Sequence, residues 1–340
     1  REHPLMNKTV KRSLLAGAAL AAGALINNAI FANARALGNP IGGEGRFWPW
    51  RDGDVFYTKR GEGDLPVVLL HGIYAGASIY EWRKNFGPLS EGPFTVYALD
   101  WLGFGLSDKP KIRYTDSAAV DLLTGFLREV VGRPCALVAS SLAAAYAIEA
   151  AHLEPDLVQS LVLVCPTGMT RLASRAGHPG SDMMHNLLSL PLIGTSLYNA
   201  LTSRVSLRTY LENQIYFDPS YVTDEVIDQY SAASHQYGSQ YAALCFVSGL
   251  LDHSVRGTFP ALTQESIRII WGREARMAPL SDAEAFLAAN PHAELTVFDK
   301  AGLLPHEEQA PSFNRLIADV VGSSAPSEEK PKRQTRKRVG

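Results

Sequence analysis

The chain has little cysteine and no grouping of metal-ligand residues. Only three cysteines, Cys135, Cys165 and Cys245, occur among 340 residues, too few and too scattered for a disulfide framework or a zinc site. The segment "PHEEQ" at 305–309 differs from the HExxH motif of zinc proteases. The sequence therefore predicts no metal and no cofactor. Cys135 and Cys165 lie in apolar stretches, and we expect them to be small core residues.

Charged residues are also few, at 19% of the chain against roughly 25% in an average globular protein. The formal net charge of −2 is unevenly distributed, because residues 1–12 carry +3 and residues 326–340 carry +4, which leaves −9 for the body between them. An acidic body argues against nucleic-acid binding by the folded part. The tail at 322–340 has the composition of a disordered, solvated segment.

The N-terminal segment lacks charge for an unusual length. Residues 13–34 contain no charged residue, follow Lys8, Lys11 and Arg12, and close with "ANA". A basic start, an apolar run and an A-x-A site are typical of a secretory signal, while 22 uncharged residues also suffice to span a bilayer. We interpret residues 1–34 as a cleaved signal peptide or a retained membrane anchor, which predicts an exported or membrane-associated protein. A frayed amphipathic helix is the alternative.

From residue 46 onward, strand-like segments alternate with helical patterns. The apolar strand-like segments are 54–60, 66–72, 94–100, 134–140, 157–165, 266–272 and 293–299, and the helical patterns are 116–131, 142–153, 281–290 and 311–321. Continuously apolar segments suit strands that are buried on both faces of a parallel sheet. The alternation predicts an α/β fold with a mostly parallel, doubly wound sheet.

One interval, residues 168–262, breaks this alternation. It has helical stretches without a clear strand and holds seven of the thirteen tyrosines. An insertion of that size after the strand at 157–165 predicts a helical cap over the carboxyl ends of the strands, where α/β sheets bind ligands. We therefore divide the chain into a core (35–167 and 263–321), a cap (168–262) and two terminal segments. Tyrosines of the cap either line an apolar pocket for a hydrophobic small molecule or pack between helices.

The segment "LVASSLAAAYA" (137–147) places two serines between a strand and a helix. A nucleophile on such a sharp turn has a strained backbone, and the residues two before and two after it must be small. Ser141 has Ala139 and Ala143 at those positions, whereas Ser140 has bulky neighbours. Ser141 is therefore the candidate nucleophile, with an ordinary strand-to-helix turn as the alternative.

Two further segments surround this serine with a recognisable pattern. They are "LLHGIYAGASIYEW" (69–82) and "ALDWLGFGLSDKP" (98–110). In order and spacing the chain resembles, over about residues 46–321, the α/β-hydrolase superfamily in its capped single-domain branch of ester and carbon–carbon bond hydrolases. The resemblance implies the α/β-hydrolase fold and an oxyanion hole from the backbone N–H groups of Ile73 and Leu142. A serine nucleophile makes the related dehalogenases and epoxide hydrolases poor guides.

The other two members of the family's triad are missing from this sequence. The family's acid lies in a segment W-G-x-x-D-x-x-x-P, and here "WGREARMAP" has Ala275 at that position. The family's histidine follows glycine after the last strand, and here "DKAGLLPHEEQ" has Leu303. The chain therefore has a degenerate catalytic triad.

Neighbouring residues are weak substitutes for the missing groups. Glu274 is a candidate acid, but adjacent loop residues usually point in different directions. His306 is a candidate base, although Pro305 and His306 followed by two glutamates also indicate a helix start. The family implies that His71 supports the oxyanion loop. The cap histidines have no recognisable context; they are His178, His185, His235 and His253.

These observations leave three functions open. The first is a hydrolase of an ester-like apolar substrate, with Ser141 as nucleophile and low or unconventional activity. The second is a catalytically inactive pseudo-hydrolase that binds a hydrophobic ligand or a protein partner. The third is a membrane-tethered structural protein. A serine hydroxyl is a weak nucleophile without a base, and loss of triad members costs about a million-fold in rate. We therefore expect Ser141 to be a sluggish nucleophile at best.

Overall fold

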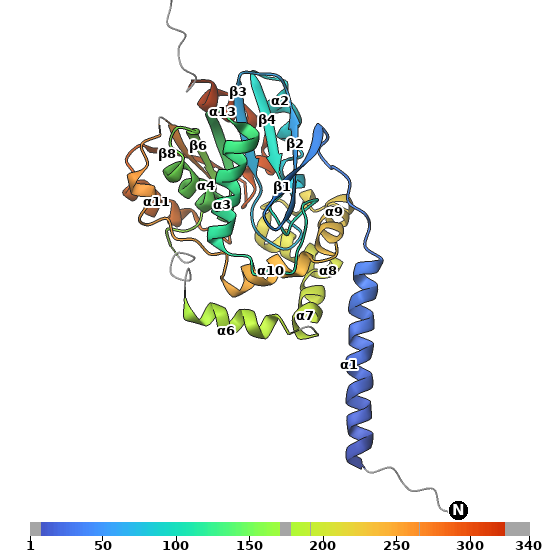
Figure 1. Ribbon diagram of the computed structural model, residues 1–340. Coiled ribbons are helices and arrows are strands. Elements are labelled where there is room, and N and C mark those ends of the chain that lie inside the picture. The colour runs from blue at the N-terminus through green and yellow to red at the C-terminus, as the bar shows by residue number, and fades with distance from the viewer. Residues whose placement is uncertain (1–7, 171–177, 191, 265, 324–340) are drawn as a thin grey trace, which may run out of the picture.

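The computed structural model describes residues 8–170, 178–190, 192–264 and 266–323, and its centre is one twisted sheet (Figure 1). Eight strands lie in the order β1-β2-β4-β3-β5-β6-β7-β8. Their bounds are β1 Glu44–Trp50, β2 Gly53–Arg60, β3 Leu65–Leu70, β4 Phe94–Leu99, β5 Cys135–Ser140, β6 Val158–Val164, β7 Ser266–Gly272 and β8 Ala293–Phe298. β2 is antiparallel to β1 and β4, and all other pairs are parallel. The predicted α/β-hydrolase fold is confirmed.

Helices cover both faces of this sheet. α3 and α4 pack against each other on one face, while α2 and α13 contact each other and the strands (Figure 1). The helices are α1 Lys8–Ala32, α2 Phe86–Ser90, α3 Asp116–Phe126, α4 Leu142–Leu153, α6 Pro179–Leu188, α7 Ile193–Leu201, α8 Arg204–Tyr210, α9 Asp224–Ser234, α10 Ser239–Ser248, α11 Ala283–Ala289, α12 Pro305–Glu308 and α13 Ala310–Ser323. The central strands are buried on both sides, which explains their continuously apolar sequences.

The edge strand β1 is absent from the sequence-based prediction. Its sequence "EGRFWPW" contains Pro49 and is mostly exposed, which are features that argue against a strand. Proline is tolerated here because the outer side of an edge strand has no partner that needs its N–H. β1 positions Trp48 and Trp50 over Gly125 of α3, where an added Cβ would lie 2.6 Å from the Trp50 ring.

Between β6 and β7 the described residues form the helices α6 to α10 and no strand. These helices lie together at one end of the sheet (Figure 1), as predicted for a helical cap inserted after the strand at 157–165. Residues 171–177, which belong to the predicted cap, lie outside the described residues.

The N-terminal helix α1 projects from the body and contacts the cap near its C-terminal end (Figure 1). The side chain of Asn27 donates to Ser196 Oγ at 3.0 Å and accepts from Asn199 Nδ2 at 2.9 Å. Phe31 packs against the ring of His235 at a centroid distance of 6.2 Å. Within the described residues, no helix combines the length and the apolar character that a membrane span requires. Residues 1–7 and 324–340 lie outside the described part.

Candidate active site

Ser141 lies on a sharp turn between β5 and α4. Its backbone angles are φ 54° and ψ −121°, a conformation that costs a non-glycine residue about 1–3 kcal/mol. Ser141 N donates to Val164 O at 2.8 Å, and Ala139 and Ala143 are fully buried beside it. Larger side chains at these two positions would have no room. The structure therefore has the strained turn that the small neighbours of Ser141 predict, while the chemical role of Ser141 stays a prediction.

The loop after β3 lies against this serine. A Cβ added to Gly72 would lie 3.5 Å from Ser141 Cβ, so the glycine backbone is close to the hydroxyl-bearing residue. Ile73, the next residue, is buried. Leu142 is the first residue of α4, and its N–H therefore belongs to the first helical turn, whose N–H groups have no partner within the helix. The two N–H groups expected to form an oxyanion hole thus flank the serine turn.

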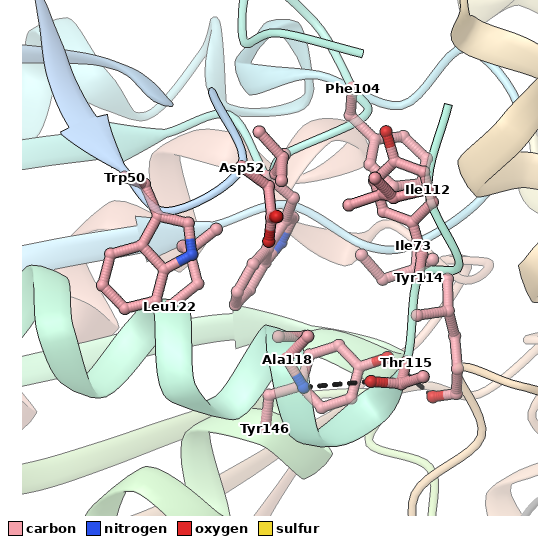
Figure 2. A pocket seen from close by; sticks show the side chains of 14 residues that line it. Trp50, Asp52, Ile73, Phe104, Ile112, Tyr114, Thr115, Ala118, Leu122 and Tyr146 are labelled. Carbon is pink, nitrogen blue, oxygen red and sulfur yellow. Dashed lines mark hydrogen bonds between the residues drawn. The ribbon is translucent and has the colours of Figure 1, made fainter. Parts of the chain in front are cut away.

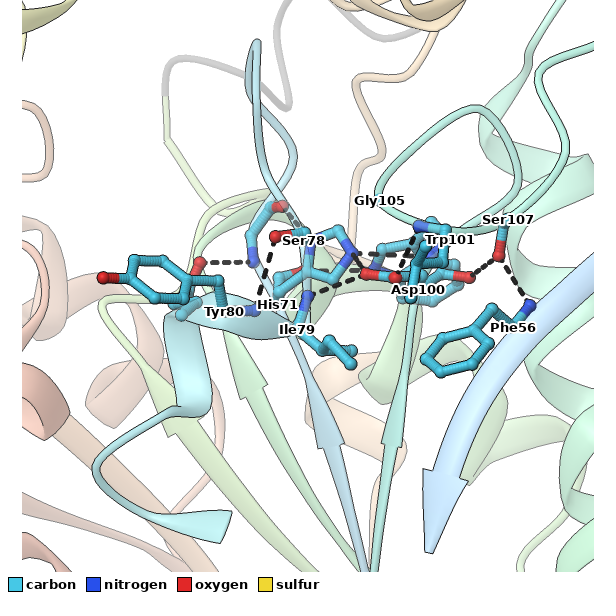
Figure 3. Close-up of polar contacts among 12 residues, drawn as sticks. Phe56, His71, Ser78, Ile79, Tyr80, Asp100, Trp101, Gly105 and Ser107 are labelled. Carbon is cyan, nitrogen blue, oxygen red and sulfur yellow. Dashed lines mark hydrogen bonds and ion pairs between the residues drawn. The ribbon is translucent and has the colours of Figure 1, made fainter. Parts of the chain in front are cut away.

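A buried histidine and aspartate hold this loop in place (Figure 3). His71 Nδ1 donates to Gly72 O at 2.7 Å, and His71 Nε2 lies 3.5 Å from Asp100 Oδ1. Asp100 accepts hydrogen bonds from Ile79 N at 2.7 Å and Leu106 N at 2.8 Å. Burial raises the pKa of Asp100, partly opposed by the charge of His71 and by these N–H groups. His71 therefore supports the loop, as the resemblance implies.

The two residues at the positions where the resemblance implies an acid and a histidine lie inside the hydrophobic core. Ala275 and Leu303 are 4% and 6% exposed and both belong to the main core cluster. Leu303 N donates to Ile215 O of the cap at 2.8 Å, so this loop is held by its backbone. Neither side chain has an atom that accepts a proton.

The two candidate substitutes make contacts of their own. Glu274 Oε2 accepts from Ala301 N at 3.0 Å, which links the loops after β7 and β8. His306 is fully buried, stacks on Trp82 at a centroid distance of 4.4 Å, and has Nε2 3.3 Å from Glu81 Oε1. Within the described residues, the Ser141 hydroxyl forms no hydrogen bond with either residue or with any other.

The cap histidines are engaged elsewhere or exposed. His178 caps α6 and is exposed, His185 contacts Ser189 and Cys245, His235 contacts Thr202 and Ser231, and His253 contacts Asp116 and Glu149. None of these contacts includes Ser141.

A buried polar cluster around Glu81 escaped the sequence-based prediction. The Glu81 carboxylate accepts from Gly72 N at 3.1 Å and from the Tyr74 hydroxyl at 2.7 Å, and Tyr74 stacks on Tyr230 of the cap. Burial alone raises the pKa of Glu81, but the hydrogen bond and charge of His306 outweigh it and lower the pKa. The closest approach of the two side chains is 3.3 Å, between His306 Nε2 and Glu81 Oε1. Glu81 thus holds the backbone of Gly72 and the side chain of Tyr74, the two neighbours of Ile73.

A small apolar cavity lies beside Ile73, in the loop that follows β3 (Figure 2). Its volume is about 40 Å³, and it is lined by Trp50, Asp52, Ile73, Trp101, Leu102, Phe104, Ile112, Tyr114, Thr115, Ala118, Ala119, Leu122, Tyr146 and Leu251. Ile73 and Tyr146 connect it to the serine turn, although Ser141 itself is not part of the lining. The lining has no cationic side chain, and Asp52 is its only acid.

The cavity differs from the pocket expected from the sequence. Its tyrosines, Tyr114 and Tyr146, come from the core, and the predicted cap contributes only Leu251. Three cap tyrosines, Tyr198, Tyr216 and Tyr230, are buried inside the protein, and the Tyr198 hydroxyl, for example, donates to Ser234 O. Among the described residues, no three His, Cys, Asp or Glu side chains gather as a metal site would require.

Comparisons with known proteins place this geometry in a family. A model of the alpha/beta hydrolase family matches residues 67–316. The 2-hydroxy-6-oxononadienedioate/2-hydroxy-6-oxononatrienedioate hydrolase of Cupriavidus pinatubonensis is 25% identical over 295 residues, covering 83% of this chain and 96% of the relative. The corresponding hydrolase of Comamonas testosteroni is 27% identical over 275 residues, covering 79% and 91%. The solved meta-cleavage product hydrolase CumD of Pseudomonas fluorescens IP01 superimposes with a TM-score of 0.65 at 26% identity, covering 80% and 95%. The chain belongs to the alpha/beta hydrolase family.

Proposed function

We propose that this chain is a pseudo-hydrolase that binds a small, neutral, apolar molecule beside its oxyanion loop. One observation carries the proposal. The positions of the acid and the histidine hold Ala275 and Leu303, both in the hydrophobic core, and the Ser141 hydroxyl has no base among its described neighbours.

The chemistry of the serine supports this proposal. A serine hydroxyl becomes a good nucleophile only when a base removes its proton. Without the triad, about a thousand-fold acceleration remains from the oxyanion hole and binding. A serine without a base would therefore leave a bound ligand largely unchanged, so the site would bind the ligand and not convert it.

The cavity supports an uncharged ligand. The relatives are named for dienedioates, which carry two carboxylates. In this chain the lining offers no cation to bind a carboxylate, and Asp52 would repel one. The volume of about 40 Å³ exceeds the roughly 10–15 Å³ that one water requires, so it suits a ligand of a few heavy atoms. A docked protein partner would have to act at another surface.

Slow hydrolysis of an apolar ester is the second candidate function. The retained φ of 54° at Ser141 favours it, because such strain costs stability and is concentrated at functional sites. In this reaction Ser141 would attack the ester, and the N–H groups of Ile73 and Leu142 would stabilise the oxyanion. The proton acceptor would be water or an unconventional group.

Binding of a small apolar probe tests the proposal. We expect xenon, a small apolar atom, to bind the purified full chain, measured by the shift of its NMR line. Ala118 lines the cavity, and Ala118→Phe should weaken binding at least tenfold. The matched control is Ala288→Phe, at an equally exposed alanine of α11, which should bind like the wild type. Equal binding by both variants, or wild-type turnover of p-nitrophenyl esters that Ser141→Ala abolishes, would contradict the proposal.

A further inference from the structure

The cap carries an exposed apolar stripe along α6 and α7. Five of its six residues lie four apart within α6 or within α7, the spacing of one helical face, and the sixth lies in the turn between the two helices. They are Met183, Leu187, Leu190, Ile193, Leu197 and Leu201, and their exposed fractions range from 41% to 74%. Scattered exposed apolar residues are normal, but an exposed row of this length marks an interaction surface.

The stripe is continuous with the N-terminal helix. Leu190 lines a groove of about 730 Å³ together with Leu20 and Ala24 of α1. Beyond the contacts that Asn27 and Phe31 make with the cap, α1 exposes Leu20, Leu25 and Ile26. Figure 1 shows α1 beside α7, at the end of the molecule where the cap helices lie. The two helical surfaces therefore lie close enough for one partner to contact both.

The charges around this surface favour a lipid partner. α1 contains no acidic residue, and its only charges are Lys8, Lys11 and Arg12 near its start. At the edges of the stripe, Arg113 pairs with Asp182 and Arg204 pairs with Asp228, so these acids are neutralised. An apolar face with a cationic end is the pattern that lies in the headgroup region of an anionic bilayer.

The shape of the surface also separates a bilayer from a second copy of the chain. A stable dimer buries about 800 Å² on each partner against a matching surface. Because α1 extends away from the body beside α7 (Figure 1), a second copy that covered both the stripe and α1 would have to accommodate this projecting helix. One leaflet of a fluid lipid bilayer, in contrast, can accommodate the projecting helix α1 and contact the stripe at the same time.

We propose that the α6–α7 stripe and the projecting part of α1 together dock on the surface of a bilayer that contains anionic lipid, with α1 inserted in one leaflet. The proposal is independent of turnover at Ser141. It assigns the stripe, in addition to the N-terminal segment, as a membrane-binding element.

Vesicle flotation with the full chain tests this docking. The vesicles are phosphatidylcholine with one third phosphatidylglycerol, and we expect the wild type to float with them at low and at high salt. The double variant Leu187→Glu/Leu197→Glu changes two side chains that are 52% and 41% exposed. Its partition into vesicles should fall at least tenfold, because two charges would enter the apolar boundary.

A matched double variant controls for the added charge. Leu153→Glu/Met277→Glu changes two side chains that are 51% and 52% exposed outside the cap, and it should float like the wild type. Circular dichroism should confirm that all three proteins are folded. Equal flotation of the stripe variant and wild type would overturn the proposal, as would complete release of the wild type by salt. A wild-type dimer in sedimentation that the stripe variant loses, without vesicle binding, would assign the stripe to a second copy instead.

Discussion

The two sides of the candidate site differ in how closely their residues match those that the resemblance to the hydrolases implies. On the side of β5, β3 and α4, Ser141 retains its strained turn and Gly72 lies against it. On the side of β7 and β8, Ala275 and Leu303, the residues at which the resemblance implies an acid and a histidine, belong to the hydrophobic core. A strained backbone turn and the side chains expected to act with it are therefore held by different contacts, so one can be present without the other.

The difference has a physical cause. The turn at Ser141 is fixed by the packing of Ala139 and Ala143 and by the bond to Val164, so the fold itself maintains it. An acid and a histidine contribute only their side chains, and burying them is costly unless they are paired. Burial of a leucine instead stabilises the fold by about 1.5–3 kcal/mol.

Restoration of the missing side chains should have the largest effect. We expect Ala275→Asp/Leu303→His to raise hydrolysis of p-nitrophenyl butyrate at least about a hundredfold, because triad members act as a unit. Either single substitution should have little effect. The gain should disappear when Ser141→Ala is added. An unchanged rate in the double variant, if it is folded, would mean that the nucleophile side has also lost its geometry.

Removal of the buried histidine should affect stability more than chemistry. His306→Ala removes the side chain that stacks on Trp82 and lies 3.3 Å from the Glu81 carboxylate, and loss of one partner of a buried pair costs about 3–5 kcal/mol. Urea denaturation measures this loss. If His306→Ala instead keeps its stability and abolishes reaction at Ser141, His306 is the base, and the two sides of the site are more alike than the structure indicates.

The strain at Ser141 predicts a smaller effect of opposite sign. Ser141→Gly should raise the free energy of unfolding by about 1 kcal/mol, because glycine adopts positive φ without steric cost but loses more chain entropy on folding. Ser141→Ala keeps the Cβ and should give no gain. Equal stability of the two variants in thermal denaturation would show that the turn is unstrained.

The two sides of the site also contact the cap through different groups, a side chain on one side and the backbone on the other. The smallest predicted effect concerns the side-chain contact. His253, near the end of the cap, binds Asp116 of α3 at 2.9 Å and Glu149 of α4 at 3.4 Å, whereas Leu303 binds the cap through its backbone. Burial alone lowers the pKa of His253, but the two carboxylates, Asp116 first, outweigh it and raise the pKa. His253 therefore makes its full contribution to the stability of the fold below the unfolded pKa of about 6.5. This contribution is lost as the pH rises through the higher folded pKa.

Urea denaturation at pH 5.5 and pH 8.5 measures this contribution. The difference in stability between wild type and His253→Gln should be largest at the lower pH. His292→Gln changes an exposed histidine and should follow the wild type at both pH values. A His253→Gln difference that grows with pH would reverse the assigned sign.

The sequence predicts the frame of this protein better than its interior contacts. The sequence predicts seven strands, several of them from continuously apolar segments that are typical of buried parallel strands. It does not predict β1, because Pro49 and exposed polar residues interrupt that strand. The turn at Ser141 followed from local crowding. The cluster of Glu81, His306 and Tyr230 joins residues far apart in the chain, so no local pattern could indicate it. The cavity likewise combines Trp50, Tyr146 and Leu251 from three distant segments.

Labelling of Ser141 by a fluorophosphonate tests most directly whether this serine has a base. The full-length wild type, Ser141→Ala and Ala275→Asp/Leu303→His would be treated with the same probe, and modification at residue 141 would be followed by mass spectrometry. We expect the wild type to label no faster than the Ser141→Ala background and the restored variant to label at Ser141. Rapid labelling of wild-type Ser141 would contradict the assignment of this chain as a pseudo-hydrolase.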